Sequence, residues 1–337
     1  MLTNFEQVIQ MLMPLLIQFN LGLSRPLLQM VATLTACLLE GTTAHLTALA
    51  EALPDVDTDH MAKEQRTRRV LSHSRLSPTL FLPVFVQLLR PVLATLPEVV
   101  LSMDRTHWKK RKRHINILMV SVHFQARAIP VFWRVLDRAG NSAFEHWKTV
   151  LTPVMTEFQA HAWLAKPPLI MTADRECASP QLAEWLKTTY HVESVLRLKR
   201  REYLCDQAQE ITLADVLRFF PQGDTRYYPH VTVTKTSQFL VNVTITWSPD
   251  AEEPLLLIAT FEGAGLGIMR YHCRFGIEAM FKDQKSNGFD VEQTRVTDSK
   301  RIETLLIFTT LAHIFCTTEG YRQEIQGDTK KNDGAAN

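Results

Sequence analysis

The sequence predicts an α/β fold in which a mixed β-sheet core follows an all-helical N-terminal region. Apolar residues recur at helical spacing through residues 1–96, whereas short alternating and β-branched segments begin after Pro97. The later segments run as three strands followed by two helix–strand units, which describes an antiparallel meander joined to parallel crossovers. We therefore expect one mixed sheet with helices on both of its faces.

The composition is that of a folded protein with two or three packed units. The chain has 337 residues, is 46% hydrophobic and carries a formal net charge of +2, so no global charge argues for an anionic partner. Five cysteines are scattered without a C-x-x-C spacing, which predicts neither a disulfide framework nor a zinc site and favours a cytoplasmic location. The apolar runs are short or interrupted, so we expect no signal peptide and no membrane contact.

Residues 1–96 are interpreted as a helical N-terminal domain. Helical periodicity covers residues 5–19, 27–39 and 46–53, and the turn residues between them supply candidate caps. Residues 63–69 (KEQRTRR) form a basic stretch that leads into a further helix. That stretch is either a solvated helix face or a surface that contacts phosphates.

Residues 97–198 contain the first part of the predicted core. Strands are expected at residues 99–103, 114–124, 128–136, 169–173 and 192–198, and helices at residues 144–158 and 179–190. The second helix has a clear start, because Ser179 can cap it and Pro180 suits the first helical position.

Residues 199–253 are interpreted as a β-rich insertion, with hairpin strands at 227–234 and 239–247. The core then resumes through residues 254–320. It is expected to contain a strand at 255–261, a helix from Gly267 to the Asn287–Gly288 pair, and a last helix over 300–317. Residues 321–337 are predicted to be a polar, frayed tail.

The helix after Gly267 carries a polar stripe. Tyr271, Arg274, Glu278 and Lys285 fall within an arc of roughly 60° at 100° per residue, and Lys282 joins them. A stripe of this kind is commonly a solvated face with ion pairs one turn apart. The alternative is that the carboxylate and its cations face a site.

Two aspartates favour the second interpretation. Asp104 follows the apolar run 99–103 and Asp174 follows the run 169–173, and a buried acid is costly without a partner. If the two strands are neighbours, the aspartates stand side by side. Three converging carboxylates suit Mg²⁺ or Mn²⁺, and two such ions can activate an attacking oxygen on a phosphodiester. Arg274, Lys282 and Lys285 suit the phosphate.

The segment YHCRFGIEAMFKDQK, residues 271–285, matches the spacing Y-x2-R-x3-E-x6-K. It resembles bacterial insertion-sequence transposases of the IS-four type, and DRTHW at Asp104 and TADRE at Asp174 resemble the two aspartate motifs of that family. The resemblance covers roughly residues 95–315. It implies a ribonuclease-H-like core, a metal-binding catalytic triad of Asp104, Asp174 and Glu278, and cut-and-paste transposition through hairpin ends.

The resemblance also implies the partners. These are double-stranded DNA at the terminal inverted repeats and at the target, bound by a dimer, with the N-terminal domain helping to recognise the ends. Tyr271, Arg274 and Lys285 would position phosphate and the DNA end. The chain departs from the family in having Glu176, a possible extra ligand, where members usually have glycine, and in a short segment after Lys285.

Trp247, in the predicted insertion, has two interpretations. The resemblance implies that it stacks on a base flipped out during hairpin formation, as the insertion tryptophan of the family does. A tryptophan in a strand is more often part of the core. Trp108 and Trp133 are expected to be packing residues, and His107 and His123 to be structural histidines.

A basic run occupies the first predicted hairpin turn: Lys109, Lys110, Arg111, Lys112 and Arg113. It is either a solvated turn or, being close to Asp104, a site that holds the DNA backbone. Residues 199–201 (KRR) are a weaker candidate for the same role.

Two other functions fit the same residues. One is a related metal-dependent nuclease that cleaves DNA without joining it. The other is a catalytically silent DNA-binding relative that regulates transposition, which the short C-terminal segment and Glu176 favour.

Overall fold

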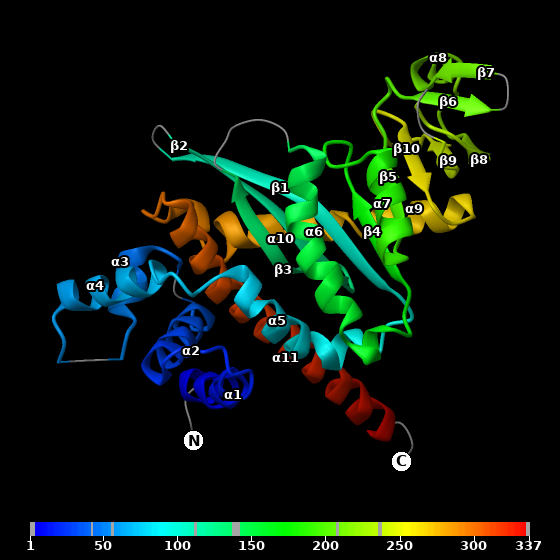
Figure 1. The fold of residues 1–337 in the computed structure, drawn as a ribbon. Helices are drawn as coiled ribbons and strands as arrows, with labels where there is room; N and C mark the ends of the chain where they lie inside the picture. The colour runs from blue at the N-terminus through cyan, green and yellow to red at the C-terminus, as the bar shows by residue number, and fades with distance from the viewer. Residues whose placement is uncertain are drawn as a thin grey trace.

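The N-terminal region is helical, as predicted. The computed structural model describes residues 4–334 apart from residues 42, 55–56, 111–112, 137–141, 207–208 and 235–237. The region contains five helices: α1 (Asn4–Gln18), α2 (Arg25–Leu39), α3 (Leu46–Glu51), α4 (His60–Leu71) and α5 (Pro78–Leu93) (Figure 1). The start of helix α5 is well defined by its sequence. Ser77 caps the helix, because its Oγ accepts from the Leu80 amide at 3.2 Å, and Pro78 occupies the first helical position.

The core is one eight-stranded mixed sheet, which confirms the predicted mixed α/β class. Its strand order is β3-β2-β1-β4-β5-β10-β9-β8. The pairs β1–β4 and β4–β5 are parallel, and the remaining pairs are antiparallel. The strands are β1 (Val99–Lys110), β2 (Arg113–Phe124), β3 (Arg127–Leu136), β4 (Leu169–Ala173), β5 (Glu193–Arg197), β8 (Thr225–Val231), β9 (Val241–Thr246) and β10 (Leu255–Ala259).

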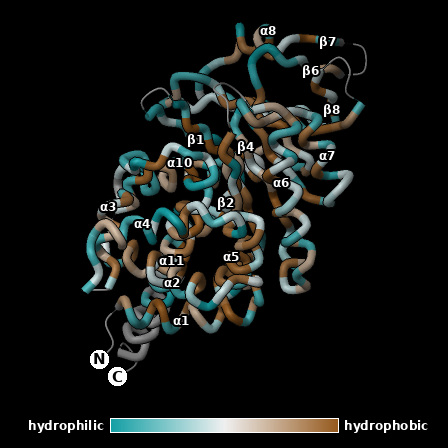
Figure 2. The backbone as a smooth tube through the Cα atoms, turned by 60° about the vertical axis from the view of Figure 1, so that its left-hand side comes forward, coloured by the Kyte–Doolittle hydropathy of each residue, from teal (hydrophilic) through white to brown (hydrophobic). Residues whose placement is uncertain are grey.

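Helices cover both faces of this sheet. Helices α6 (Phe144–Gln159) and α7 (Pro180–Tyr190) lie over one face, and α9 (Ala264–His272) and α10 (Phe275–Lys282) lie over the other (Figures 1 and 2). Helix α7 begins where the sequence predicted, since Ser179 Oγ accepts from the Leu182 amide at 3.1 Å. The crossovers through α6 and α7 let β4 and β5 return parallel to β1.

The helical region and the sheet share one hydrophobic core. Helix α11 (Ser299–Gly334) contacts α2, α4 and α5 on one side and β3 on the other. The Phe85 and Trp133 rings lie 5.8 Å apart, and the Trp133 indole donates to the Glu303 carbonyl at 3.1 Å. The packing role predicted for Trp133 is therefore confirmed.

The segment predicted as an insertion is only partly separate. Strands β6 (Tyr203–Asp206) and β7 (Gln209–Thr212) form a small sheet of their own beside helix α8 (Leu213–Leu217). The predicted hairpin, β8 and β9, instead continues the main sheet, because β9 pairs with β10. The hairpin is confirmed, but it belongs to the core sheet.

Three predicted boundaries are wrong. Strand β1 continues to Lys110, because it pairs with β2 as far as Arg113. The helix expected after Gly267 starts at Ala264 and divides at residues 273–274 into α9 and α10, which leads into the π-helical turn η2 (Asp283–Asn287). Helix α11 continues beyond residue 317 through the segment predicted to be a tail, as far as Gly334.

Two short 3₁₀ helices complete the described elements, η1 (Ala162–Leu164) and η3 (Val291–Gln293). None of the helices within the described residues combines the length and the apolar character needed to span a bilayer.

Candidate active site

Asp104 and Asp174 lie side by side on neighbouring strands, as predicted. The parallel register of β1 and β4 ends at the pair Met103–Ala173, and each aspartate is the next residue along the chain. Asp174 directly follows β4, whereas Asp104 lies within β1, because β1 continues along β2. The parallel pairing therefore opens at the two carboxylates.

Arg274 joins two of the predicted acids. Its guanidinium is only 3% exposed, and Nη1 donates to Asp104 Oδ2 at 2.9 Å while Nη2 donates to Glu278 Oε1 at 2.6 Å. Arg274 can reach both because it stands at the break between α9 and α10, one turn before Glu278. The polar stripe thus faces the aspartates, and the solvated-face interpretation is wrong for Arg274.

Tyr271 connects the stripe to the third acid. Its side chain is fully buried, and its hydroxyl donates to Asp174 Oδ1 at 3.1 Å. The Arg274 guanidinium lies 5.6 Å from the centre of the Tyr271 ring. Burial raises the pKa of the phenol to about 12, so the hydroxyl stays protonated and remains a donor. Tyr271 and Arg274 together contact all three predicted carboxylates.

The two aspartates differ in proton affinity. Burial raises the pKa of Asp104 to about 6. The Arg105 amide, which donates to Asp104 Oδ1 at 2.7 Å, and the charge of Arg274 both act to lower this pKa but do not outweigh burial. Burial also acts on Asp174. There it is outweighed by the Arg175 amide, the charges of Arg274 and Arg197, and the Tyr271 hydroxyl, so the pKa of Asp174 lies below its ordinary value.

Glu278 is the most open of the three acids, with 56% of its side chain exposed. Lys282, one turn further along, is exposed as well. Lys285 is directed to β1 instead, where Nζ donates to the His107 carbonyl at 3.0 Å and lies 5.8 Å from the Trp108 ring centre. Burial lowers the pKa of Lys285. Of the two lysines, Lys282 is the one open to a solvent-borne ligand.

Glu176 pairs with Arg105 on β1. The Arg105 Nε and Nη2 atoms approach the two carboxylate oxygens at 2.6 and 2.9 Å. This two-point ion pair engages both oxygens, and Arg105 Nη1 also donates to Asn116 Oδ1 at 3.3 Å. The structure therefore gives Glu176, two residues after Asp174, a cationic partner in Arg105.

The donor chemistry suits a divalent cation, because hard ions take carboxylate oxygens. Among the residues that the structure describes, however, no three histidine, cysteine, aspartate or glutamate side chains are arranged to hold a metal ion. The Arg274 guanidinium lies between Asp104 and Glu278 and offsets part of their negative charge. An ion bound there would share these carboxylates with Arg274.

The basic run spans the end of β1 and the start of β2, so Lys109, Lys110 and Arg113 lie in strands and not in the predicted turn. Lys110 Nζ donates to the Glu292 carbonyl at 3.3 Å, and Arg113 Nη1 donates to the Thr297 carbonyl at 3.3 Å. Lys109 is exposed. Arg111 and Lys112 lie outside the described residues.

Trp247 directly follows β9 and is half-buried against the core. Its indole donates to the Ala251 carbonyl at 3.0 Å, within the same connection to β10. Trp108 is buried, which confirms its packing role. His123 is half-buried, and burial lowers its pKa, as expected of a structural histidine. His107 is exposed.

Four residues beside Asp174 were not selected from the sequence or were given little weight: Arg175, Arg197, Arg200 and Glu253. Arg197 Nη1 lies 3.6 Å from Asp174 Oδ1, and all three arginines contact Glu253. The position of Arg175 next to Asp174 was a usable signal. No sequence pattern indicates Glu253, which reaches the site from the connection between β9 and β10.

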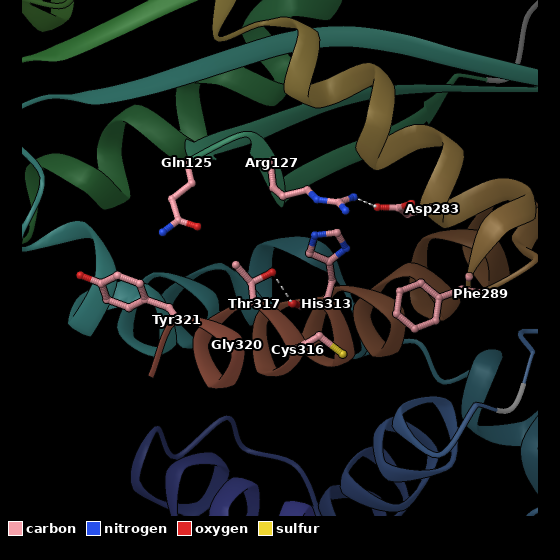
Figure 3. A pocket seen from close by; sticks show the side chains of 10 residues that line it. Gln125, Arg127, Asp283, Phe289, His313, Cys316, Thr317, Gly320 and Tyr321 are labelled. Atoms are coloured by element: carbon pink, nitrogen blue, oxygen red, sulfur yellow. Dashed lines mark hydrogen bonds and ion pairs between the residues drawn. The ribbon is translucent and has the colours of Figure 1, made fainter. Parts of the chain in front are cut away.

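A separate cavity of about 450 Å³ lies beside α11 (Figure 3). Its lining includes Arg127 and Asp283, whose Nη1 and Oδ2 atoms are 2.8 Å apart, together with His313 and Tyr321. Burial lowers the pKa of His313 to about 4, so the imidazole is neutral. None of the residues predicted for the site lines this cavity.

Neither a protein-family model nor a curated protein matches this chain. The family resemblance therefore rests on the residues of the three motifs and on the contacts among them.

Proposed function

We propose that the chain is a DNA transposase of the DDE type, similar to the IS-four insertion-sequence transposases. The observation that carries the proposal is the contact of the signature segment, residues 271–285, with both aspartate motifs. Tyr271 donates to Asp174, and Arg274 bridges Asp104 and Glu278. Three motifs chosen from separate parts of the sequence thus meet at one place.

A ribonuclease-H-like core fits this proposal. Strands β1 to β3 form an antiparallel meander, and α6 and α7 return the chain to the parallel strands β4 and β5. This arrangement brings the ends of the two aspartate motifs together. In the proposal, the small β6–β7 sheet and the β8–β9 hairpin correspond to the β-rich insertion of the family.

The residues of the site would have distinct roles. Asp104, Asp174 and Glu278 would hold Mg²⁺ or Mn²⁺, as a pair of ions by analogy with the family, and the metal would activate an oxygen nucleophile and stabilise the leaving oxygen. Arg274 orients Asp104 and Glu278 and limits their mutual repulsion. Tyr271 fixes the orientation of Asp174. Lys282 is exposed beside Glu278 and can contact a phosphate.

The partner in this proposal is double-stranded DNA in the cytoplasm, bound by a dimer at the terminal repeats and joined to a target. The exposed Lys109 would contact the backbone near the β1–β2 turn, together with Arg111 and Lys112. Contacts of this kind give affinity without sequence choice. The N-terminal helices would then supply recognition of the ends.

The test is Glu278→Gln, assayed on a duplex that carries the DNA flanking the coding sequence. With Mg²⁺ or Mn²⁺ the variant should lose nicking, because it lacks one negative ligand, and should keep its affinity for the duplex. Glu145→Gln, an exposed change on α6, serves as the matched control and should nick normally. Normal nicking by Glu278→Gln would remove the proposal.

The same assay separates the two other functions. Adding a 3′-hydroxyl DNA end and a target duplex distinguishes a transposase, which joins strands, from a nuclease, which only cleaves. Binding without any cleavage in either metal would identify a catalytically silent DNA-binding protein.

A further inference from the structure

Three arginines at the ends of β4 and β5 converge on one carboxylate. Arg175 Nη1 donates to Glu253 Oε2 at 3.3 Å, and its Nη2 atom pairs with Oε1. Arg197 Nη2 lies 2.6 Å from Oε1, and Arg200 Nη2 lies 3.4 Å from Oε2. Each oxygen of Glu253 is therefore shared by two guanidinium groups.

Glu253 reaches this cluster from a connection at the surface. It lies between β9 and β10, in a segment whose residues 248–250 and 252 are exposed. Because β10 runs antiparallel to β5, with Leu257 opposite Arg197, the start of β10 lies beside the end of β5 (Figure 1). Gln222 Nε2 donates to the Pro249 carbonyl at 2.6 Å and helps to hold the connection.

The charges at this place do not balance. Three cations face Glu253, and Arg197 is also 3.6 Å from Asp174, so three positive groups meet two negative ones. The side chains of Arg175 and Arg200 are 41% and 54% exposed, so a dissolved anion can reach them. Ion pairs at such exposure add little to stability, and exchanging one anion for another costs little.

We propose that Arg175, Arg197 and Arg200 form a binding site for a phosphate group of a nucleic-acid backbone, and that Glu253 occupies this site until the phosphate displaces it. Guanidinium groups bind phosphate oxygens through paired hydrogen bonds, as they bind a carboxylate. A phosphate held there would lie next to Asp174. The choice of nucleic acid as the source of phosphate rests on the proposed function.

The test is Glu253→Gln, compared with Glu252→Gln. Glu252 is the preceding residue, is exposed and forms no ion pair with any described residue, so its variant makes the same charge change outside the cluster. Both are titrated with a fluorescein-labelled duplex of arbitrary sequence in EDTA, so that neither metal nor cleavage contributes. Glu253→Gln should bind roughly two- to fivefold more tightly than the control.

The salt dependence gives a second measurement. The freed arginines neutralise one more phosphate, so the slope of log affinity against log salt should become steeper by about 0.9. Adding Arg200→Ala to Glu253→Gln should reverse both changes. Equal affinity and slope in Glu253→Gln and Glu252→Gln, with both variants folded by thermal unfolding, would show that Glu253 only anchors its connection and would overturn the proposal.

Inorganic pyrophosphate separates this proposal from the function. Tighter pyrophosphate binding by Glu253→Gln than by Glu252→Gln, without a change in duplex binding, would support an anion site and reject nucleic acid as its ligand. A wild-type protein that nicks DNA while Glu253→Gln gains affinity for neither probe would reject the site and leave the function standing.

Discussion

Arg274 donates to Asp104 at 2.9 Å although the two residues are 170 positions apart in the chain. The ion pair is nearly buried on the arginine side, and Glu278 lies on the other edge of the same guanidinium. Removing one partner of such a pair leaves a buried charge without compensation.

Arg274→Gln should therefore destabilise the fold by about 3 kcal/mol, measured by urea unfolding. Arg69→Gln, at an exposed position on α4, should change the free energy of unfolding by less than about 0.5 kcal/mol. The double variant Asp104→Asn with Arg274→Gln should recover part of the loss, because Asp104, the less exposed of the two carboxylates that Arg274 pairs with, is then neutral. A loss no larger than that of Arg69→Gln would contradict the buried pairing.

Tyr271→Phe removes a hydroxyl and keeps the buried ring. Because that hydroxyl donates to Asp174 at 3.1 Å, we expect a loss of about 1–2 kcal/mol in the free energy of unfolding. Nicking should fall while the affinity for duplex DNA is kept, since the change affects the orientation of Asp174. Tyr271→Leu should cost more stability, because it also leaves a cavity. Equal nicking by Tyr271→Phe and wild type would show that the hydrogen bond is not needed.

Phe85→Ala tests the shared core. Phe85 is fully buried on α5 and packs on Trp133 of β3, so its truncation should cost about 3–5 kcal/mol. The helical region and the sheet should still unfold together. Helical circular dichroism and tryptophan fluorescence would then give one coincident transition. Separate transitions for the two signals would show that the N-terminal helices fold independently.

His313 predicts a pH dependence of stability. Burial lowers its pKa to about 4 in the folded protein, where Asp283 acts against this shift and Arg127 adds to it. The unfolded imidazole takes up a proton near pH 6.5, so the unfolded state binds more protons between these values. Stability is therefore present above about pH 6.5 and is lost as the pH falls towards 4.

Between pH 7 and pH 4.5 the contribution of His313 amounts to about 2 kcal/mol. His313→Gln should show a loss smaller by that amount in urea unfolding at the two pH values. His114→Gln, at an exposed position on β2, should follow the wild type. The burial of a neutral imidazole would be refuted if all three proteins lost stability equally.

Functional residues could be predicted from the sequence where a local helix or strand pattern determines their position. The aspartates were found because each follows an apolar run, and runs on neighbouring parallel strands place their ends together. Ser179 fixed the start of α7 for a similarly local reason. The polar stripe was recognised because Tyr271, Arg274 and Glu278 recur at helical spacing, and the break at residues 273–274 is too small to disturb their common direction.

Contacts that depend on the path of a connection could not be predicted. Periodicity identified β8 and β9 as a hairpin but could not show that β9 pairs with β10, because pairing partners are not encoded in a single strand. Glu253 reaches Arg197 because β10 pairs with β5 on its other side, which brings the start of β10 beside Arg197. Likewise, the residues of β1 alone do not show that this strand extends beyond its pairing with β4. Its length is set by its pairing with β2.

The pairing of β9 with β10 limits which segments of the chain can be deleted. Residues 199–253 cannot be replaced by a brief linker in the way that a self-contained module could, because β10 would lose its neighbour on one side. Its backbone amides and carbonyls would then face water along an open, apolar strand. Proteins truncated in this way should aggregate through the unpaired edge of β10, whether or not they keep catalytic activity.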